Sequence, residues 1–320
     1  METKKTPVLA IVVPCFNEEA VLPTTANRLQ DIIDELIESG MAGFESHIIF
    51  VDDGSVDATW GHIHKLHENN PGRCKGLKLS RNYGHQNALW AGLMAAKDQA
   101  DCVISLDADM QDDPAVIPNM LTRYTDGNEI VYAVRKQRVN DSIFKRRTAR
   151  GFYWLMRIMG VGIIPDHADY RLASKRALDG LREFTEVNLF LRGIFPIIGF
   201  KTATVFYDRH ERLAGQSKYP LKKMLAFAID AISSFSTVPL KIITWVGFLV
   251  FILSGAMIIE ALVSTLIYHR VVRGWASTVL PIYFLGGIQL LSLGIIGEYI
   301  GKIYKEVKRR PRYIVESELL

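Results

Sequence analysis

Four aspartates gather in the short segment SLDADMQDDP, which directly follows the apolar run CVI and ends at a proline. Two of them, Asp107 and Asp109, are two residues apart, so an extended chain would point both side chains the same way. Carboxylates held that close repel each other unless a cation lies between them, and their oxygens suit Mg²⁺ or Mn²⁺. Because such an ion binds through one or two carboxylates plus substrate phosphates, the segment predicts a metal-assisted site for a diphosphate.

The other two aspartates of this segment have a simpler explanation. Asp112 and Asp113 precede Pro114, a residue favoured at the first position of a helix. Negative charge stabilises a helix N-terminus, so beginning the next helix is a sufficient role. We assign that role to Asp113 and a chemical role to Asp107 and Asp109.

Apolar, β-branched runs alternate with segments of helical periodicity through the first half of the chain. The runs cover residues 8–13, 47–51, 75–79, 102–106 and 129–134, and the helical segments include residues 29–39, 85–97 and 114–124. Strands without polar alternation are buried on both faces, which is typical of a parallel sheet covered by helices. The pattern therefore predicts an α/β domain with a doubly wound, mostly parallel sheet.

Polar segments follow the first four of these strands, with the sequences PCFNEE, DDGSVDAT, SRNYGHQNA and DADMQDDP. In open parallel sheets, ligands bind outside the carboxyl ends of the strands, so we expect the active site at that edge. The chain has no G-x-G-x-x-G after the first strand and no G-x-x-x-x-G-K-[ST]. The usual dinucleotide and P-loop phosphate cradles are therefore excluded.

Composition narrows the class of protein. The chain has 320 residues, is 49% hydrophobic and carries a formal net charge of +4. This charge averages an acidic first half and an apolar second half, so it does not predict nucleic-acid binding. The three cysteines, Cys15, Cys74 and Cys102, have no C-x-x-C spacing, and we expect buried, reduced thiols in a cytoplasmic domain.

The second half of the chain is typical of a membrane protein. Residues 242–268 and 277–300 are each apolar over about the length of a bilayer, so we expect two transmembrane helices. Basic residues flank them, at Lys218, Lys222, Lys223 and Lys241 before the first and at Lys302, Lys305, Lys308, Arg309, Arg310 and Arg312 after the second, against Arg270 and Arg273 between them. The positive-inside rule then predicts that the first domain and the tail are both cytoplasmic.

Seven segments together resemble one known family. They are VVPCFNEE, VDDGSVDAT, LSRNYGHQNAL, DADMQDDP, DYRL, GQSKY and GEYIGKIYKEVKRRPRY, and they extend over nearly the whole chain. They resemble the family 2 glycosyltransferases of the GT-A fold. More narrowly, they are similar to the polyisoprenyl-phosphate glycosyltransferases, which include dolichol-phosphate mannose synthase and the bacterial undecaprenyl-phosphate glucosyltransferases.

The resemblance implies a domain order. Residues 1–215 would form a cytoplasmic GT-A catalytic domain, residues 216–241 interfacial amphipathic helices, residues 242–304 the two transmembrane helices, and residues 305–320 a basic cytoplasmic tail. The interfacial segment mixes lysines with an apolar face, although an ordinary packed helix would do so too. A homo-oligomer in the inner membrane, of the size of a tetramer, is also implied.

The resemblance also implies site residues. The residues expected to contact the nucleotide sugar are Pro14, Asn17, Glu18, Asp52 or Asp53, Arg81 and Asp107. Those expected to bind the metal are Asp107, Asp109 and Gln111, and those expected to bind phosphate are Arg135, Arg138, Arg209 and Lys218. Asp169 would be a catalytic base or a carboxylate that orients the acceptor. Pro14, Asn17 and the Asp53-Gly54 pair could equally make turns. The run HADYRL departs mildly from the family pattern at His167, which is a spacer or a titrating group.

The resemblance implies inverting transfer of a sugar, glucose by preference, from a UDP-sugar to undecaprenyl phosphate for cell-envelope glycosylation. A divalent metal can absorb the charge that develops on the departing diphosphate, so Asp109 joins Asp169 as a catalytic residue. The acceptor phosphate is already an anion, so a strong general base is hardly needed. The larger problem is to hold two anions close together.

Four alternatives remain open or are set aside. Another donor, such as UDP-N-acetylglucosamine, UDP-galactose or GDP-mannose, would fit the same frame. A processive polysaccharide synthase would need Q-x-x-R-W, which the RGW at residues 273–275 does not supply. A phosphohydrolase of the haloacid-dehalogenase type expects Thr or Val where this chain has Gln111. An inactive nucleotide-sugar-binding scaffold would not need the intact acids.

Overall fold

A computed structural model describes residues 6–135, 158–159, 167–187, 190–208, 232, 236–266 and 275–320. The chain divides into two compact units. The first, called here the sheet unit, comprises Met1–Tyr153, Gly162–Pro220 and Arg310–Leu320. The second, the helical unit, comprises Trp154–Val161 and Leu221–Arg309.

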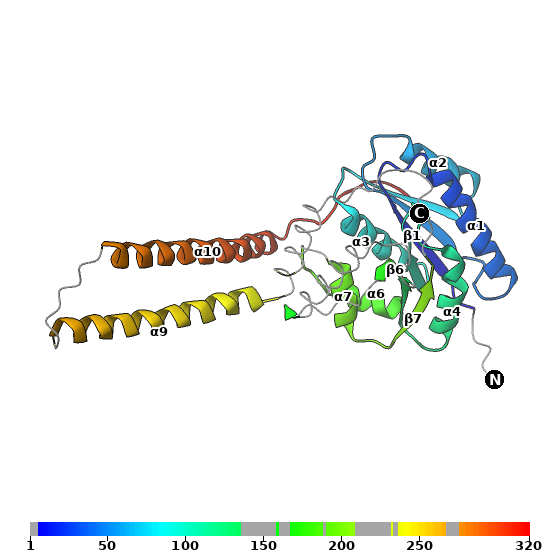
Figure 1. The fold of residues 1–320 in the computed structure, drawn as a ribbon. Coiled ribbons are helices and arrows are strands. Elements are labelled where there is room, and N and C mark those ends of the chain that lie inside the picture. Colours follow the sequence, from blue (N-terminus) through cyan, green and yellow to red (C-terminus); the bar gives the residue numbers. More distant parts are fainter. Residues whose placement is uncertain are drawn as a thin grey trace. The chain divides into compact units, whose positions relative to one another are not determined.

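One eight-stranded sheet forms the centre of the sheet unit (Figure 1). Its strands are β1 (Leu9–Cys15), β2 (His47–Asp52), β3 (Cys74–Leu79), β4 (Cys102–Ser105), β5 (Ile130–Arg135), β6 (His167–Ser174), β7 (Thr202–Tyr207) and β8 (Val315–Leu319). Their order across the sheet is β7-β5-β6-β4-β1-β2-β3-β8. Only β6 and β8 run antiparallel to their neighbours, so the predicted mostly parallel α/β sheet is confirmed.

Helices cover both faces of this sheet. They are α1 (Leu22–Glu38), α2 (Thr59–Asn69), α3 (His85–Ala96), the short 3-10 helix η1 (Pro114–Val116), α4 (Ile117–Thr125), α6 (Lys175–Arg182) and α7 (Leu191–Ile198). Buried residues of α1, α2 and α4 join the main apolar core under one face, while α3, α6 and α7 gather on the other (Figure 1). Every residue of β1 and β2 is buried, as expected for strands covered on both faces.

The C-terminal residues form a strand that the sequence did not predict. β8 pairs antiparallel with β3 at the edge of the sheet, with Gly76 opposite Leu319, and Lys78 forms a 2.8 Å ion pair with Glu316. Just before this strand, Arg312 donates to the backbone oxygens of Phe184 and Glu186 and stacks on the Trp90 ring. The end of the chain is therefore an integral part of the sheet unit.

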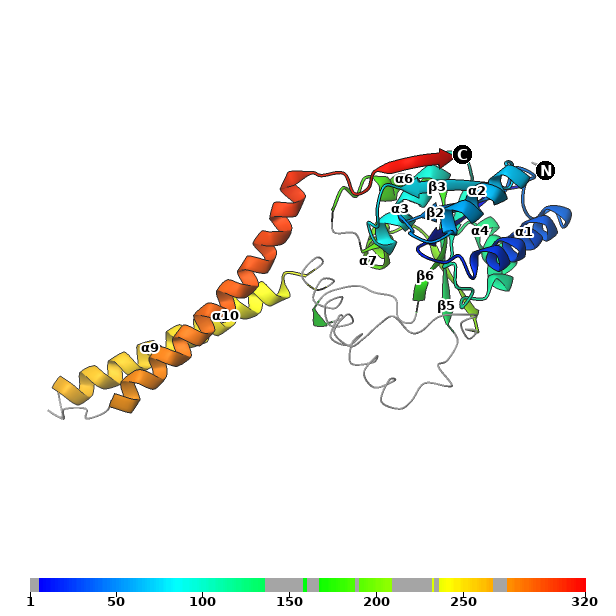
Figure 2. The same ribbon diagram turned by 90° about the horizontal axis from the view of Figure 1, so that it is seen from above.

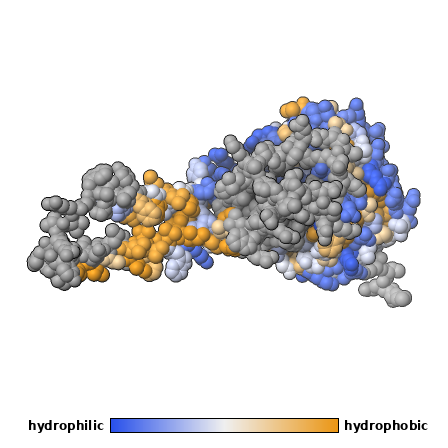
Figure 3. Space-filling model, viewed as in Figure 1, coloured by the Kyte–Doolittle hydropathy of each residue, from blue (hydrophilic) through white to orange (hydrophobic). Residues whose placement is uncertain are grey.

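Two long helices make up most of the described helical unit. Helices α9 (Val238–Leu266) and α10 (Trp275–Lys308) form an antiparallel hairpin (Figures 1 and 2), in which the Tyr299 hydroxyl donates to the Ser236 oxygen at 2.6 Å. Hydrophobic side chains gather on their surface (Figure 3).

One of the two expected membrane spans has a candidate among the described helices. Among the described residues, Phe284–Lys308 of α10 is the one segment long and apolar enough to cross a membrane, and Val238–Val250 is a shorter apolar stretch. The predicted second span thus has a candidate, and a crossing by α9 stays a prediction. The expected interfacial segment, residues 216–241, lies mostly outside the described residues.

Candidate active site

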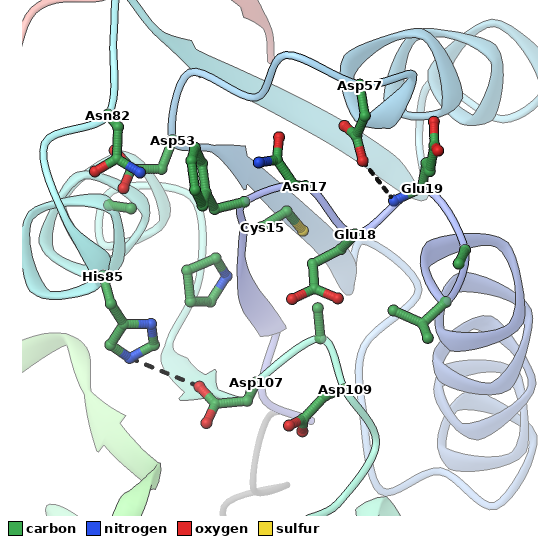
Figure 4. Close-up of a pocket in the computed structure, with 16 residues that line it drawn as sticks. Cys15, Asn17, Glu18, Glu19, Asp53, Asp57, Asn82, His85, Asp107 and Asp109 are labelled. Atoms are coloured by element: carbon green, nitrogen blue, oxygen red, sulfur yellow. Dashed lines mark hydrogen bonds and ion pairs between the residues drawn. The ribbon is translucent and has the colours of Figure 1, made fainter. Parts of the chain in front are cut away.

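A pocket of about 470 Å³ opens at the carboxyl edge of the sheet, where the site was expected. Its walls come from the end of β1, from the loops after β1, β2, β3 and β4, and from the first turn of α3 (Figure 4). Asp107 and Asp109 lie on one wall, and Glu18 points into the same space from the loop after β1 (Figure 4). Four segments far apart in the sequence thus converge on one cavity.

The loop after β1 is braced by the loop after β2. Asn17 has a φ of 55°; its backbone N–H donates to Ser55 Oγ at 3.0 Å, and its side-chain oxygen accepts from the Val56 N–H at 3.0 Å. The Glu18 N–H donates to Thr59 Oγ1 at 2.9 Å. Pro14, Asn17 and Glu18 all line the pocket, so shaping the turn and shaping the pocket are the same task.

The two aspartates that end β2 have different surroundings. Asp53 lines the pocket, and its carboxylate accepts from the backbone N–H groups of Tyr83 at 2.7 Å and Gly84 at 2.9 Å. Burial raises the pKa of Asp53 against the effect of these two bonds. Asp52 is fully buried, is not part of the pocket wall, and accepts from the Ser55 N–H at 3.1 Å. Of the two candidates for reading the nucleotide, the structure places Asp53 at the site.

The loop after β3 presents a different residue from the one expected. The Arg81 guanidinium stacks on the Tyr83 ring at 4.2 Å and does not line the pocket, whereas the neighbouring Asn82 does. Gly54 lets this loop approach, because a Cβ there would come within 2.3 Å of the Arg81 carbonyl carbon. The loop is therefore fixed against the end of β2.

Two of the three predicted metal residues, Asp107 and Asp109, lie on the pocket wall, and Gln111 does not; the two aspartates are presented for a different geometric reason from the one expected. β4 ends at Ser105, and the chain turns at Met110 with a φ of 53°, so Asp107 and Asp109 project from a turn and not from an extended strand. The Gln111 backbone N–H donates to Asp109 Oδ1 at 3.2 Å and stabilises this turn.

The surroundings of Asp107 and Asp109 fit a divalent cation. Burial raises the pKa of Asp107 against the opposing charge of His85, and nearby carboxylates raise it further. This unfavourable negative charge is what a cation would relieve. Within the described residues, no group of three or more His, Cys, Asp or Glu side chains could hold an ion. Mg²⁺ usually takes one or two carboxylates from the protein and its other ligands from substrate phosphates and water.

A second carboxylate, Asp169, lies behind the pocket in the centre of an ionic network. Antiparallel β6 carries it between β4 and β5, and only 4% of its side chain is exposed. Asp169 Oδ1 accepts from Arg171 Nη2 and from Arg192 Nε at 3.3 Å. Oδ2 accepts from Arg192 Nη2 at 3.0 Å and Gln86 Nε2 at 3.2 Å.

His85 joins this network to Asp107, one of the predicted metal residues. Its Nε2 lies 3.3 Å from Asp169 Oδ2 and 3.6 Å from Asp107 Oδ1 (Figure 4 shows the second contact). Partial loss of hydration would lower the pKa of His85, whose side chain is 40% exposed, but the two carboxylates outweigh this effect and raise the pKa to about 9. Burial would likewise raise the pKa of Asp169, but Arg192 and His85 hold it well below its ordinary value.

A further cluster anchors the segment that carries Asp107 and Asp109. Asp112 is buried and accepts from the Tyr207 hydroxyl at 2.6 Å and from Arg135 Nη2 at 3.3 Å. Arg135, predicted to bind phosphate, is therefore engaged with Asp112 and is not on the pocket wall. Asp113 accepts from the Ala115 N–H at 3.0 Å at the start of η1, which confirms its helix-starting role.

Three other predicted phosphate-binding residues, Arg138, Arg209 and Lys218, lie outside the described residues, as does the side chain of His167. The structure instead adds His85, Gln86, Arg192 and Asp112 to the site region. His85 and Gln86 stood within a polar segment already placed at the sheet edge, whereas the run LFLRG around Arg192 carried no signal.

Comparison with known proteins decides the class. The family model Glycosyl transferase family 2 matches residues 10–180. The chain belongs to this family. Over 98% of its length it is 53% identical to an uncharacterized glycosyltransferase of Bacillus subtilis strain 168, YkoT, covering 92% of that protein.

Two further relatives carry more specific names. The chain is 37% identical to the bactoprenol glucosyl transferase of Shigella phage SfV, over 97% of this chain and 98% of that protein. It is 38% identical to the prophage bactoprenol glucosyl transferase homolog of Escherichia coli K12, over 96% of this chain and 98% of that protein. These matches confirm the predicted family resemblance.

The candidate site of this family 2 glycosyltransferase has two chemically distinct parts. The pocket wall with Asp107 and Asp109 suits a cation-bound diphosphate. The network around Asp169 is a compact arrangement of positive groups, with Arg171, Arg192 and His85 around one carboxylate. His85 contacts Asp107 in the first part and Asp169 in the second, so one side chain joins the two parts.

Proposed function

We propose that this glycosyltransferase moves glucose, with inversion, from a UDP-sugar to the phosphate of a polyprenyl phosphate of the undecaprenyl type. The observation that carries the proposal is near-full-length identity of 37% and 38% to proteins named bactoprenol glucosyl transferase. An apolar segment at Phe284–Lys308 supports it, since a lipid acceptor must be met at a membrane.

On the donor side, Pro14, Asn17, Glu18 and Asp53 shape the nucleotide pocket, while Asp52 and Arg81 act indirectly by supporting its loops. Asp107 and Asp109 would hold Mg²⁺ or Mn²⁺, and the Gln111 backbone supports Asp109. A bound divalent ion supplies the positive charge that offsets the charge developing on the departing diphosphate.

On the acceptor side, the nucleophile is a phosphate oxygen that is already anionic near neutral pH. A strong base is hardly needed, so Asp169 serves to take up a residual proton or to orient the acceptor. Arg135, Arg138, Arg209 and Lys218 remain the proposed phosphate-binding set, with Arg135 held in place by Asp112. The enzyme acts in the inner membrane as a homo-oligomer, with two spans and its sheet unit in the cytoplasm.

The test is transfer of labelled sugar to undecaprenyl phosphate by purified full-length protein, using a panel of UDP- and GDP-sugars with Mg²⁺ or Mn²⁺. We expect lipid-linked product from UDP-glucose, none with EDTA, and at least about 100-fold less with Asp109→Ala. Asp113→Ala is the matched control, since it removes a carboxylate from the same segment but costs only a helix cap.

Other results would redirect the proposal. Product from a different donor alone would replace glucose and keep the reaction. Label released only as free sugar or phosphate would favour the hydrolase, and donor binding without turnover on any lipid acceptor would favour the inactive scaffold.

A further inference from the structure

Arg192 is a cation beside the active site to which neither the family match nor the motifs give a role. It is the second residue of α7, and Gln86 holds the start of this helix in position. The Leu191 N–H donates to Gln86 Oε1 at 3.1 Å, and Gln86 Nε2 donates to Asp169 at 3.2 Å. The start of α7 is thus tied to the start of α3 and to Asp169.

The carboxylate of Asp169 is surrounded by donors. Two nitrogens of Arg192 and one of Arg171 donate to it, Gln86 adds an amide N–H, and His85 Nε2 lies 3.3 Å away. A carboxylate has about four lone-pair sites, so these groups fill it. With 4% of its side chain exposed, Asp169 offers little surface to an incoming acceptor.

Arg192 differs from Arg171 in what it can reach. Arg171 is 1% exposed and stacks its guanidinium on the Phe195 ring at 4.5 Å, so it is an interior partner of Asp169. Arg192 keeps 35% of its side chain exposed. It makes two contacts to Asp169, at 3.0 and 3.3 Å, and such a bidentate pair fixes the plane of the guanidinium.

The position of Arg192 relative to the donor pocket follows from a chain of contacts. Asp107 lies 3.6 Å from His85, His85 lies 3.3 Å from Asp169, and Asp169 lies 3.0 Å from Arg192. Arg192 is therefore close to the donor diphosphate site but is separated from it by two side chains. A cation in this place can hold a second anion near the first without competing for it.

We propose that Arg192 binds the phosphate of the polyprenyl phosphate acceptor, and that Asp169 is a positioning residue that holds Arg192 for this purpose. This inference rests on the proposed function, because it needs a phosphate-bearing acceptor. Arginine is suited to the task, since its guanidinium has five N–H donors, more than the two bonds to Asp169 use, and its charge does not depend on pH. The acceptor oxygen attacks as the anion it already is. Of the two roles given to Asp169 under the proposed function, this is the orienting one, exercised through Arg192.

The first test compares Arg192→Gln with wild-type protein in the transfer assay. We expect the acceptor KM to rise about 10- to 100-fold, the effect of losing a charged hydrogen-bonded contact, with the donor KM within about twofold. Arg192→Lys should lie between the two, because it keeps the charge but not the fork. Arg123→Gln, which removes an exposed arginine of α4, is the control and should change neither constant. An unchanged acceptor KM in Arg192→Gln would overturn the proposal.

The second test asks what Asp169 does. If it acts through Arg192, Asp169→Asn should raise the acceptor KM as well, and the double variant Asp169→Asn/Arg192→Gln should be no worse than the more severe single variant. A base role predicts the opposite result: Asp169→Asn would lower kcat at an unchanged acceptor KM, and the two changes would add.

A third measurement separates this inference from the proposed function. Binding of a short prenyl phosphate and of the matching prenol to the full-length protein can be measured by calorimetry without turnover. Preference for the phosphate should be present in wild type and lost in Arg192→Gln. If wild type transfers no sugar but keeps this preference, the proposed reaction fails and the phosphate site stands; if the preference survives in Arg192→Gln, the site fails.

Discussion

At the level of single residues, identical side chains in one short segment do different work because their partners differ. Asp113 accepts a backbone N–H at the start of η1, and Asp107 faces the pocket. Asp112 is buried against Tyr207 and Arg135, from β7 and β5, and so fastens the turn that presents Asp107 and Asp109. The order of these aspartates along the chain carried no sign of the last role, since both partners are distant in sequence.

The Tyr207 hydroxyl can be tested as part of this anchor. Tyr207→Phe removes the 2.6 Å hydrogen bond to a buried carboxylate, and we expect the free energy of unfolding to fall by about 1.5–3 kcal/mol. Tyr83→Phe removes a 3.1 Å contact between exposed hydroxyls and should change it by less than about 0.5 kcal/mol. Urea unfolding of the detergent-solubilised protein measures both. Equal losses in the two variants would show that Asp112 does not depend on Tyr207.

The cysteines were predicted to be buried, reduced thiols, and the described structure confirms that all three are buried and free. Burial raises the pKa of Cys15, which borders the pocket, well above its ordinary value and raises that of Cys74 to about 11. Below a raised pKa the reactive thiolate falls tenfold per pH unit, so at pH 8 only ~0.1% of Cys74 is thiolate. We expect iodoacetamide to leave the native protein unmodified by mass spectrometry at pH 8, to label it faster as pH rises, and to label it fully in urea. Rapid native labelling at pH 8 would contradict this.

At the level of elements, hydrophobic pattern predicted the buried strands well and the others poorly. The five apolar runs became β1 to β5 within two residues at each end. β6 was missed because Asp169 and Arg171 interrupt its apolar pattern, although they pair with each other in the interior. β8 was missed because VESEL has three polar residues between two apolar ones, which is not the pattern of a buried strand. It lies at the sheet edge, where its residues alternate between half-buried and exposed. Helix α1 begins seven residues before the predicted segment, at Leu22.

The close packing of α3 on the sheet depends on Gly92. A Cβ at this position would lie 2.3 Å from Val12 Cγ1 and 2.7 Å from Val51 Cγ2. Gly92→Ala should therefore destabilise the protein by about 1–3 kcal/mol, despite the better helix propensity of alanine. It should also lower activity, because α3 carries His85 and Gln86.

A matched substitution separates packing from propensity. Gly61 lies inside α2, and a Cβ added to it would meet no atom within 4 Å, so Gly61→Ala should stabilise the protein by about 1 kcal/mol. Thermal unfolding of both variants measures the contrast. Similar melting temperatures for the two would mean that α3 can shift away from the sheet.

At the level of the whole molecule, chain connectivity constrains how the helical unit can meet a membrane. β7 precedes α9 in the chain, β8 follows α10, and both strands belong to one sheet. A sheet cannot have strands on both sides of a bilayer, because strands must hydrogen-bond directly to their neighbours. The chain between β7 and β8 therefore crosses a membrane an even number of times. If Phe284–Lys308 spans, a second crossing is required, and α9 is the helix placed to make it.

This argument predicts the outcome of cysteine labelling in intact cells. The native thiols are buried, so an added cysteine reports its own side of the membrane. Arg270→Cys, between the two helices, should react with a membrane-impermeant maleimide from outside, whereas Glu316→Cys on β8 should react only after permeabilisation. Wild-type protein is the unlabelled control. Labelling of both positions from outside, or of neither, would contradict two spans. The helical hairpin would then lie along the bilayer surface, and the acceptor would have to reach a surface-bound enzyme.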